Sequence, residues 1–557
     1  MTDQRIQYLE EMVGAGHPTK ADTLNRLAVV EHNNDGTHKA LTQVKDPWID
    51  VRAFGAVGDG ITDDTAAIVN AIASLPASGG EIRLIPGKTH LVTCPTTATY
   101  AGGTIYTSFT MKSNLKVVGW NSIIKMANNV TTALSPKATA VFFSNQYLTN
   151  ISFEGITFDM NGANNSTNST NLFQSAILFS SDNARCDDLK IYRCSFQNSV
   201  GTSVVGLSQT NTVGALIGFR NIIRDNYFYH TNAYLTTTDH STIGGIVNDS
   251  VFEGNTFEFS AIRSDNIGVA IDLQGTNNRF VNNRVKNYAI GVQIGGNYVT
   301  PSEDIVVANN VFSPMKNGGV NFFREVATAQ AIDKITIAHN HIDLDDSATT
   351  IPEKYGVQAV TQYGLSDILI QGNTIKKTGN TVQSAGVYFT PNLAGQKYSN
   401  IVIDGNTVIG TYEGVHILGT VSDLGTVKII NNTFRNINNL AAGGASSMGV
   451  QFYLNGRTID EVIITNNTFI NDASVNFTYG VWIGTNAGAG TYGTIVSDNN
   501  TYKGITNLGP LPSLSYTESG VGSILTKRFG SDILYYAAAP TSGAWVTGQR
   551  VYNKTPT

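Results

Sequence analysis

The sequence predicts an all-β protein whose chain winds into a right-handed parallel β-helix, with a helical cap and connector at its N-terminal end. Three observations predict this fold: an Asn-x-hydrophobic motif repeats along the chain, a Gly-Val motif repeats in step with it, and charge is scarce. Of the 557 residues, 41% are hydrophobic, 14% are charged and 55 are Gly. This composition is typical of β structure with many tight turns, and it excludes a disordered chain.

The first motif is an Asn that recurs at intervals of 26 to 35 residues, followed by any residue and then a hydrophobic one. Asn tolerates left-handed backbone dihedrals at a bend, and stacked Asn side chains can hydrogen-bond to one another. We therefore expect a ladder of Asn side chains along one corner of the helix. Its members are Asn226, Asn255, Asn283, Asn310, Asn340, Asn373, Asn406, Asn432, Asn467 and Asn500.

The second motif gives each period at least two short strands. A strand of about 4–6 residues cannot bury its apolar face alone. Stacking the periods pairs each strand with its equivalents in the adjacent coils, about 4.8 Å away, and parallel crossovers of this kind are right-handed. The Gly of the second motif is found at Gly268, Gly291, Gly319, Gly356, Gly386, Gly414, Gly449 and Gly480.

Insertions concentrate in the turn that follows the Asn strand. Two examples are residues 343–353 and 436–447. Because insertions on one side of a solenoid usually build its binding face, we expect ligands to bind on this side.

Residues 49–92 predict a cap for the open end of the helix. Asp63 or Asp64 can cap a helix that begins at Thr65, and Ile68 and Ile72 lie on one face of it. Two glycines end the helix, and an alternating strand follows at residues 81–85.

The stretch DVRAFGAVGDGITDDTAAIVNAI…GGEIRLIPGKTHLV resembles the first coils of the pectate-lyase-like superfamily. That superfamily includes phage tailspikes, polygalacturonases, related glucanases and alginate epimerases. The resemblance covers residues 49–130. It implies a right-handed parallel β-helix that acts on polysaccharides, but it does not specify the reaction.

We divide the chain into four segments. Residues 1–48 form an N-terminal helical connector, which resembles short N-terminal pieces of phage tail proteins; the alternative is an irregular cap. Residues 49–130 hold the first coils with the capping helix, and residues 131–504 form the parallel β-helix. Residues 505–557 are a non-repeat segment that resembles a C-terminal module of phage proteins, and we expect this module to be truncated.

The side chain between Val and the next hydrophobic residue of the second motif points outward, because side chains alternate along a strand. This rule gives an outward strip of amides and aromatics, a surface that suits sugars; alternatively, a neighbouring subunit covers part of it. Ala270 is its first member, and Asp272, Phe323 and Leu418 lie two residues further along their strands. The predicted substrate-binding residues are Gln293, Asn321, Gln358, Tyr388, His416, Gln451, Tyr453 and Trp482.

Hydrolysis of a glycosidic bond needs two carboxyl groups. We predict Asp272 and Glu325 as this pair, two coils apart and therefore separated by roughly 9.6 Å of helix rise, close to the spacing found in inverting hydrolases. The Asn-Thr-Asp and Gly-His-Gly motifs of polygalacturonases and the Asp-Pro-His-Glu string of alginate epimerases are absent. A lyase that uses His416 as its base stays open as an alternative.

The sequence indicates no cofactor and no metal site. His339, His341 and Asp343 share a strand face, but a turn cluster explains them better than a metal does. The net charge of −6 and the absence of a Lys/Arg run argue against nucleic acid, and no apolar run is long enough for membrane insertion. The first residues contain no apolar core typical of a signal peptide.

Together these observations predict a phage tailspike-like protein that binds and hydrolyses a bacterial surface polysaccharide: capsule, exopolysaccharide or O-antigen. The resemblance to tailspikes implies a homotrimer, attached to a phage tail or baseplate through residues 1–48 and located on the virion tail or outside the cell. Two alternatives stay open: a polysaccharide lyase or epimerase of the same fold, and a non-catalytic glycan-binding adhesin.

Overall fold

The computed structural model describes most of the chain from Trp48 onward, so the expected N-terminal connector lies outside the described residues. The described ranges are 48–100, 103–130, 138–165, 173–181, 183–209, 217–231, 240–263, 268–296, 301–324, 332–346, 353–361, 364–379, 381–391, 397–419, 422–438, 447–454, 456–473, 475–484, 490–505, 521–529, 533–536 and 550–553.

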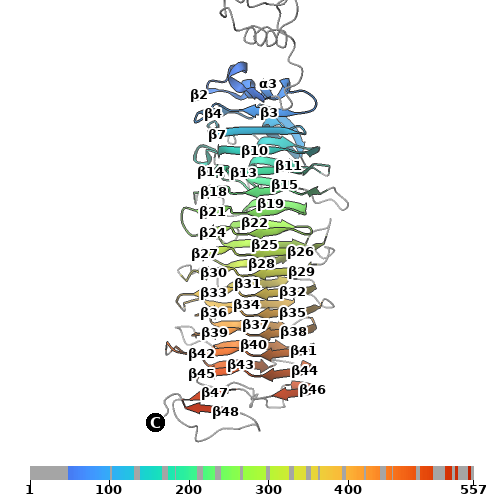
Figure 1. Cartoon of the computed structure of the whole chain (residues 1–557), viewed down its shortest axis with the longest axis vertical. Helices are drawn as coiled ribbons and strands as arrows, with labels where there is room; N and C mark the ends of the chain where they lie inside the picture. The colour runs from blue at the N-terminus through green and yellow to red at the C-terminus, as the bar shows by residue number, and fades with distance from the viewer. Residues whose placement is uncertain are drawn as a thin grey trace, which may run out of the picture.

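Short strands stack in chain order along the long axis of the molecule, from the capping helix to the C-terminal coils (Figure 1). Each full coil contributes one strand to each of three series, and equivalent strands of successive coils pair in parallel. Among the described strands, the one antiparallel pair is β5 with β6, at the start of the helix. The fold is the expected right-handed parallel β-helix.

The first series precedes the Asn of each coil and forms one long face. Its strands are β10 (Ser152–Asp159), β13 (Lys190–Tyr192), β17 (Ile222–Arg224), β20 (Val251–Glu253), β23 (Arg279–Val281), β26 (Ser302–Ala308), β29 (Ile332–Ala338), β32 (Leu365–Gln371), β35 (Tyr398–Asp404), β38 (Leu424–Ile430), β41 (Thr458–Thr465), β44 (Gly490–Asp498) and β46 (Val521–Phe529).

The second series follows the Asn corner and begins with the second half of β10. Its other strands are β14 (Ser195–Gln197), β18 (Tyr227–His230), β21 (Thr256–Phe259), β24 (Arg284–Lys286), β27 (Val311–Met315), β30 (His341–Leu344), β33 (Thr374–Lys377), β36 (Thr407–Ile409), β39 (Thr433–Arg435), β42 (Thr468–Ile470), β45 (Thr501–Lys503), β47 (Ile533–Tyr536) and β48 (Arg550–Asn553).

The third series carries the Gly-Val motif and forms a separate sheet of 15 described strands, called here the Gly-Val sheet. These strands are β5 (Thr96–Tyr100), β6 (Gly103–Thr110), β8 (Ala138–Ser144), β11 (Gln174–Ser180), β15 (Val205–Gln209), β16 (Gly218–Phe219), β19 (His240–Asn248), β22 (Gly268–Gln274), β25 (Ile290–Gly296), β28 (Gly318–Arg324), β31 (Glu353–Thr361), β34 (Gln383–Pro391), β37 (Glu413–Gly419), β40 (Met448–Leu454) and β43 (Tyr479–Gly484).

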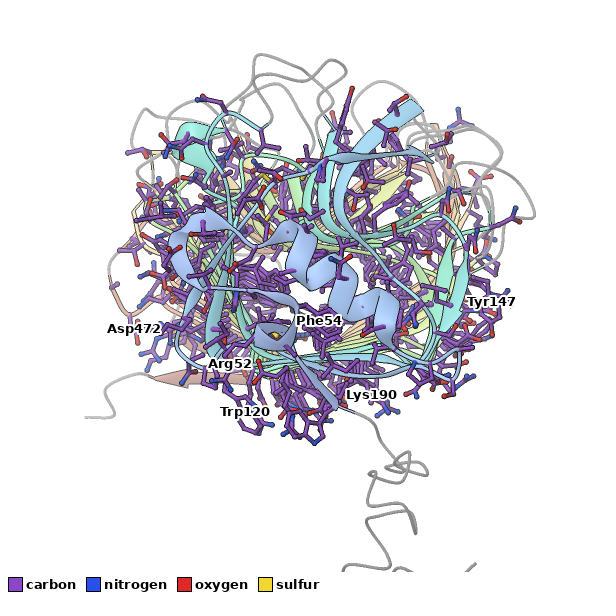
Figure 2. The ribbon with its side chains drawn as sticks, turned by 90° about the horizontal axis from the view of Figure 1, so that it is seen from above. Arg52, Phe54, Trp120, Tyr147, Lys190 and Asp472 are labelled. Carbon is purple, nitrogen blue, oxygen red and sulfur yellow. The ribbon has the colours of Figure 1, made fainter. Side chains whose placement is uncertain are left out.

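The cap forms as the sequence predicts, with α3 lying across the open end of the shaft (Figure 2). The Asp63 carboxylate accepts the amide proton of Thr65, whereas the buried Asp64 carboxylate accepts from Val57 and Gly58 and contacts His90 Nδ1 at 2.7 Å. The remaining elements of the N-terminal coils are β1 (Trp48–Asp50), η1 (Val51–Phe54), β2 (Asp59–Asp63), α3 (Thr65–Ser74), β3 (Gly80–Arg83), β4 (Thr89–Val92), β7 (Leu115–Met126), β9 (Tyr147–Thr149), β12 (Arg185–Asp187) and η2 (Gly162–Asn164).

The ten recurring asparagines form a continuous buried ladder. In a typical step, Asn340 donates from its backbone N–H and its Nδ2 to Asn373 Oδ1, both at 2.9 Å, and from Nδ2 to the Val307 carbonyl at 2.9 Å. The left-handed residue is not the ladder Asn, as we expected, but the residue immediately before it, for example His339 with φ 55°. The Asn side chain thus satisfies polar backbone groups that the bend would otherwise leave unpaired.

The glycines of the second motif are required by close packing. A Cβ on Gly414 would lie 2.2 Å from the Gly449 carbonyl oxygen and 2.3 Å from the Phe434 ring, the hydrophobic residue of the Asn-x-hydrophobic motif. Similar approaches occur at Gly291, Gly319, Gly356, Gly386, Gly449 and Gly480. The Asn-x-hydrophobic motif and the Gly-Val motif therefore recur in step because the hydrophobic residue of the first packs against the glycine of the second inside the helix.

Columns of like side chains fill the shaft. Phe158, Phe196, Phe228 and Phe257 stack on successive coils with centroid separations of 5.1, 4.7 and 4.7 Å. Full burial of each such ring stabilises the fold by about 1.5–3 kcal/mol. The three cysteines of the chain are free and buried within this structure.

The C-terminal segment lacks the sequence repeat, yet its described strands extend the helix. β46 pairs in parallel with β44, β47 with β45, and β48 with β47. Backbone pairing therefore continues beyond residue 505.

Candidate functional site

One register row of outward side chains runs along the Gly-Val sheet and is called here the outer row. Strand pairing aligns each member with the next, so neighbours lie about 4.8 Å apart and the row spans roughly 34 Å. Its members are half-buried, except for Gln451, which is 9% exposed. They are Asp272, Gln293, Asn321, Gln358, Tyr388, His416, Gln451 and Trp482.

The structure corrects the first position of the predicted strip. Asp272, not Ala270, aligns with Gln293, and Ile271 aligns with Val292. Ala270 is fully buried, because it lies at the inward position that Gly291 occupies on the next coil. The predicted inward valines at 292, 320 and 357 are fully buried, so the register of the later coils is confirmed.

Of the predicted catalytic pair, Asp272 belongs to the outer row and Glu325 lies outside the described residues. The Asp272 carboxylate accepts a hydrogen bond from Gln274 Nε2 at 2.9 Å. Two coils further on, the outer row is occupied by Asn321, and Glu325 follows four residues later in the sequence.

Aromatic side chains cluster in the C-terminal half of the outer row. Tyr388 stacks on Tyr355 of the preceding coil at 4.3 Å, and its ring meets the His416 ring edge-on at 5.1 Å. Trp482 stacks with Tyr453 at 5.8 Å. These rings offer flat apolar surfaces on both sides of His416 and Gln451, as sugar recognition requires.

His416 contacts a buried carboxylate that the sequence analysis did not single out. Its Nδ1 lies 2.7 Å from Glu413 Oε2, and the two side chains are only 12% and 5% exposed. Burial, together with the charge of Glu413, raises the pKa of the neighbouring Tyr412 to about 12, so its phenol stays protonated.

A local break in the strand alternation brings Glu413 and His416 together. Residues three apart on a regular strand point to opposite faces. On β37, Gly414 and Val415 both face the shaft, where Gly414 packs against Phe434 and Val415 is fully buried. Glu413 therefore lies on the same side of the sheet as His416.

The two insertions predicted to build the binding face border the Gly-Val sheet. They connect β30 to β31 and β39 to β40, and their central parts lie outside the described residues. Within the described ranges, no group of three or more His, Cys, Asp or Glu side chains could hold a metal ion. Nor does any helix in the part of the chain that the structure covers meet the length and hydropathy of a membrane span.

No known protein-family model and no curated protein matches the sequence. Solved structures of the tailspike protein of E. coli bacteriophage HK620 share the fold. The complex with a pentasaccharide has a TM-score of 0.60 and 15% identity, and the match covers 85% of this chain and 81% of that one. A double mutant, which lacks one aspartate and one glutamate, has a TM-score of 0.63 and 15% identity over 88% and 83%. A mutant with Glu replaced by Gln, also with pentasaccharide, has a TM-score of 0.60 and 17% identity over 85% and 81%.

Proposed function

We propose that this chain is a phage tailspike-like protein that binds a bacterial surface polysaccharide along the outer row and depolymerises it. The observation that carries the proposal is the row itself: on eight successive coils it presents one carboxylate, followed by an uninterrupted line of amide and aromatic side chains. Amides pair with hydroxyl groups as donors and acceptors, and rings cover apolar faces of sugars. The likeness to a tailspike that holds a pentasaccharide supports the same conclusion.

For the chemistry we propose glycosidic hydrolysis by Asp272 and Glu325. The position of Asp272 in the outer row supports its access to a bound glycan. In this mechanism one carboxylic acid protonates the leaving oxygen while the other carboxylate activates water or attacks the anomeric carbon.

A lyase is the second candidate, because His416 offers an imidazole whose Nδ1 is oriented by a buried carboxylate. A base held in this way is suited to abstracting a proton from a sugar carbon next to a carboxylate group. An adhesin, the third candidate, would use the outer row for binding alone.

We further propose a homotrimer attached to a phage tail or baseplate through residues 1–48. Outward apolar side chains support a subunit contact. The first strand series presents a mainly apolar outward row, named here the flank row, on the edge where Figure 2 labels Lys190. Its half-buried apolar members are Ile222, Val251, Val306, Leu369, Val402, Ile463 and Val496.

A screen of capsule, exopolysaccharide and lipopolysaccharide preparations tests this function by loss of viscosity and release of reducing ends. Hydrolysis predicts new reducing ends without an unsaturated uronate, and it predicts that Asp272→Asn and Glu325→Gln each abolish the release while glycan binding persists. A lyase would yield products with the ultraviolet absorbance of an unsaturated uronate. Binding without any cleavage by the wild-type chain would identify an adhesin.

A further inference from the structure

Two polar atoms on adjacent coils of the outer row are buried and have no hydrogen-bond partner: His416 Nε2 and Gln451 Oε1. The two residues are register partners, about 4.8 Å apart along the helix axis. Most buried polar atoms in proteins are paired, so an adjacent pair of unpaired ones requires an explanation.

Glu413 determines what His416 can offer. In the neutral form of the imidazole the proton resides on Nδ1, because the carboxylate 2.7 Å away accepts a hydrogen bond from it. Nε2 then carries a lone pair and is an acceptor. Gln451 Oε1 is an acceptor as well. Two acceptors cannot hydrogen-bond to each other, so each of these atoms needs a hydrogen-bond donor from outside the pair.

The neighbouring side chains indicate what kind of donor fits. The Tyr388 ring stands against His416 on one side, and the stacked pair of Tyr453 and Trp482 begins on the coil of Gln451 and extends to the next. Flat apolar walls with acceptors between them suit a sugar ring, whose C–H faces cover aromatic carbon and whose edge carries O–H or amide N–H donors.

We propose that Glu413, His416 and Gln451 form a subsite that recognises one sugar unit through two donor groups, with Glu413 as the positioning residue that fixes the imidazole tautomer. This inference rests on the proposed function, since it assigns the substrate contacts of the same row. Asp272 lies five coils away, roughly 24 Å along the axis, so this subsite binds a part of the glycan distant from that carboxylate.

Direct binding of intact surface polysaccharides, measured by surface plasmon resonance with the full chain, tests the subsite. Glu413→Gln keeps the side-chain size but replaces the carboxylate by an amide. In the orientation where the amide N–H donates to Nδ1, the imidazole proton moves to Nε2. Gln451→Leu removes an acceptor, and Gln451→Glu keeps one. We expect Glu413→Gln and Gln451→Leu to weaken binding roughly tenfold, and Gln451→Glu to bind within a fewfold of wild type.

A control carboxylate is available on the second strand series, away from the outer row and the insertions. Glu258 Oε1 lies 2.7 Å from Lys286 Nζ, and Glu258 belongs to β21. Glu258→Gln should leave glycan binding unchanged. Thermal melting of every variant verifies that it is folded.

An independent readout uses protein whose histidines are labelled with nitrogen-15. Nuclear magnetic resonance should show the Nδ1–H tautomer of His416 in the wild type, the Nε2–H tautomer in Glu413→Gln, and a shift of Nε2 when glycan binds. If wild type and all variants bind glycan equally, the subsite is wrong while the proposed function stands. If Gln451→Glu binds as weakly as Gln451→Leu, the acceptor assignment is wrong. If the wild type binds no glycan, the proposed function and the subsite both fail.

Discussion

At the scale of single residues, the helix is held together by side chains that serve the coil above or below. The ladder asparagines bond to the coils before and after them, and the motif glycines from Gly291 onward leave room for a hydrophobic residue across the shaft. Small changes at these positions should therefore act on several coils at once.

Replacing a ladder Asn should destabilise the protein. Asn373→Ala removes the acceptor for two N–H groups of Asn340 and the donor to the Ile337 carbonyl, and these groups stay buried. We expect a cost of about 1–3 kcal/mol in unfolding free energy, measured by denaturant titration. Gln371→Ala, which loses one surface hydrogen bond to Asp404, is the control. Equal stability of the two variants would contradict the ladder account.

Adding a methyl group in the Gly slot should cost stability through overpacking. A Cβ at Gly386 would lie 2.6 Å from the Gly414 carbonyl oxygen and 2.7 Å from Val408. We expect Gly386→Ala to destabilise by about 1–3 kcal/mol. At Gly295 the nearest atoms lie at 3.3 Å, so Gly295→Ala should cost much less. Thermal melting at one scan rate compares the melting temperatures of the two variants. A wild-type melting temperature for Gly386→Ala would contradict the close packing at this glycine.

At the scale of the strands, the sequence repeats identify almost every coil. In one coil, however, the Gly-Val letters alone assign the inward and outward positions wrongly. In the coil of β22, a Gly-Val pair occurs two residues before the true inward position, which Ala270 occupies. Only pairing with β25 reveals the shift. Glu413 was missed for a different reason: strict alternation assigns it to the wrong face, because the motif residues Gly414 and Val415 both face the shaft.

At the corner after β30, burial alone would raise the pKa of Asp346, but hydrogen bonds from Lys377 and Thr381 and the charge of Lys377 hold it below its usual range. Because the folded pKa is lower than the unfolded one, the pair stabilises the fold above the usual Asp pKa and loses this contribution as pH falls through the folded value.

We therefore predict that Asp346→Asn lowers the melting temperature at neutral pH and reduces its decline on acidification to about pH 3. Asp304→Asn, at an exposed position on β26, is the control. A wild-type-like acid profile for Asp346→Asn would show that the pair contributes nothing to folding.

At the scale of the whole molecule, a stack of coils exposes two long faces with different chemistry. The Gly-Val sheet presents amides and rings, and the first strand series presents the flank row, which is mainly apolar but also holds Lys190, Arg279 and Lys428. A single chain leaves both faces to solvent, which favours assembly through the apolar one.

A homotrimer predicts a particle of three times the chain mass of 59.6 kDa by sedimentation equilibrium. Charges introduced by Leu369→Glu together with Val402→Glu should dissociate it, because they would be desolvated in the contact. Glu substitutions at Thr426 and Thr494, which lie outside the flank row, control for added charge. A wild-type chain that sediments as a monomer would refute the assembly.

The central claim is that glycan lies along the outer row, and hydrogen exchange read by mass spectrometry tests it most directly. The probe is the oligosaccharide released from whichever polysaccharide the chain depolymerises. The account predicts slowed exchange in peptides covering β34, β37, β40 and β43, with little change in β32, β35, β38 and β41. Protection confined to the first strand series would place the glycan on the other face and contradict the account.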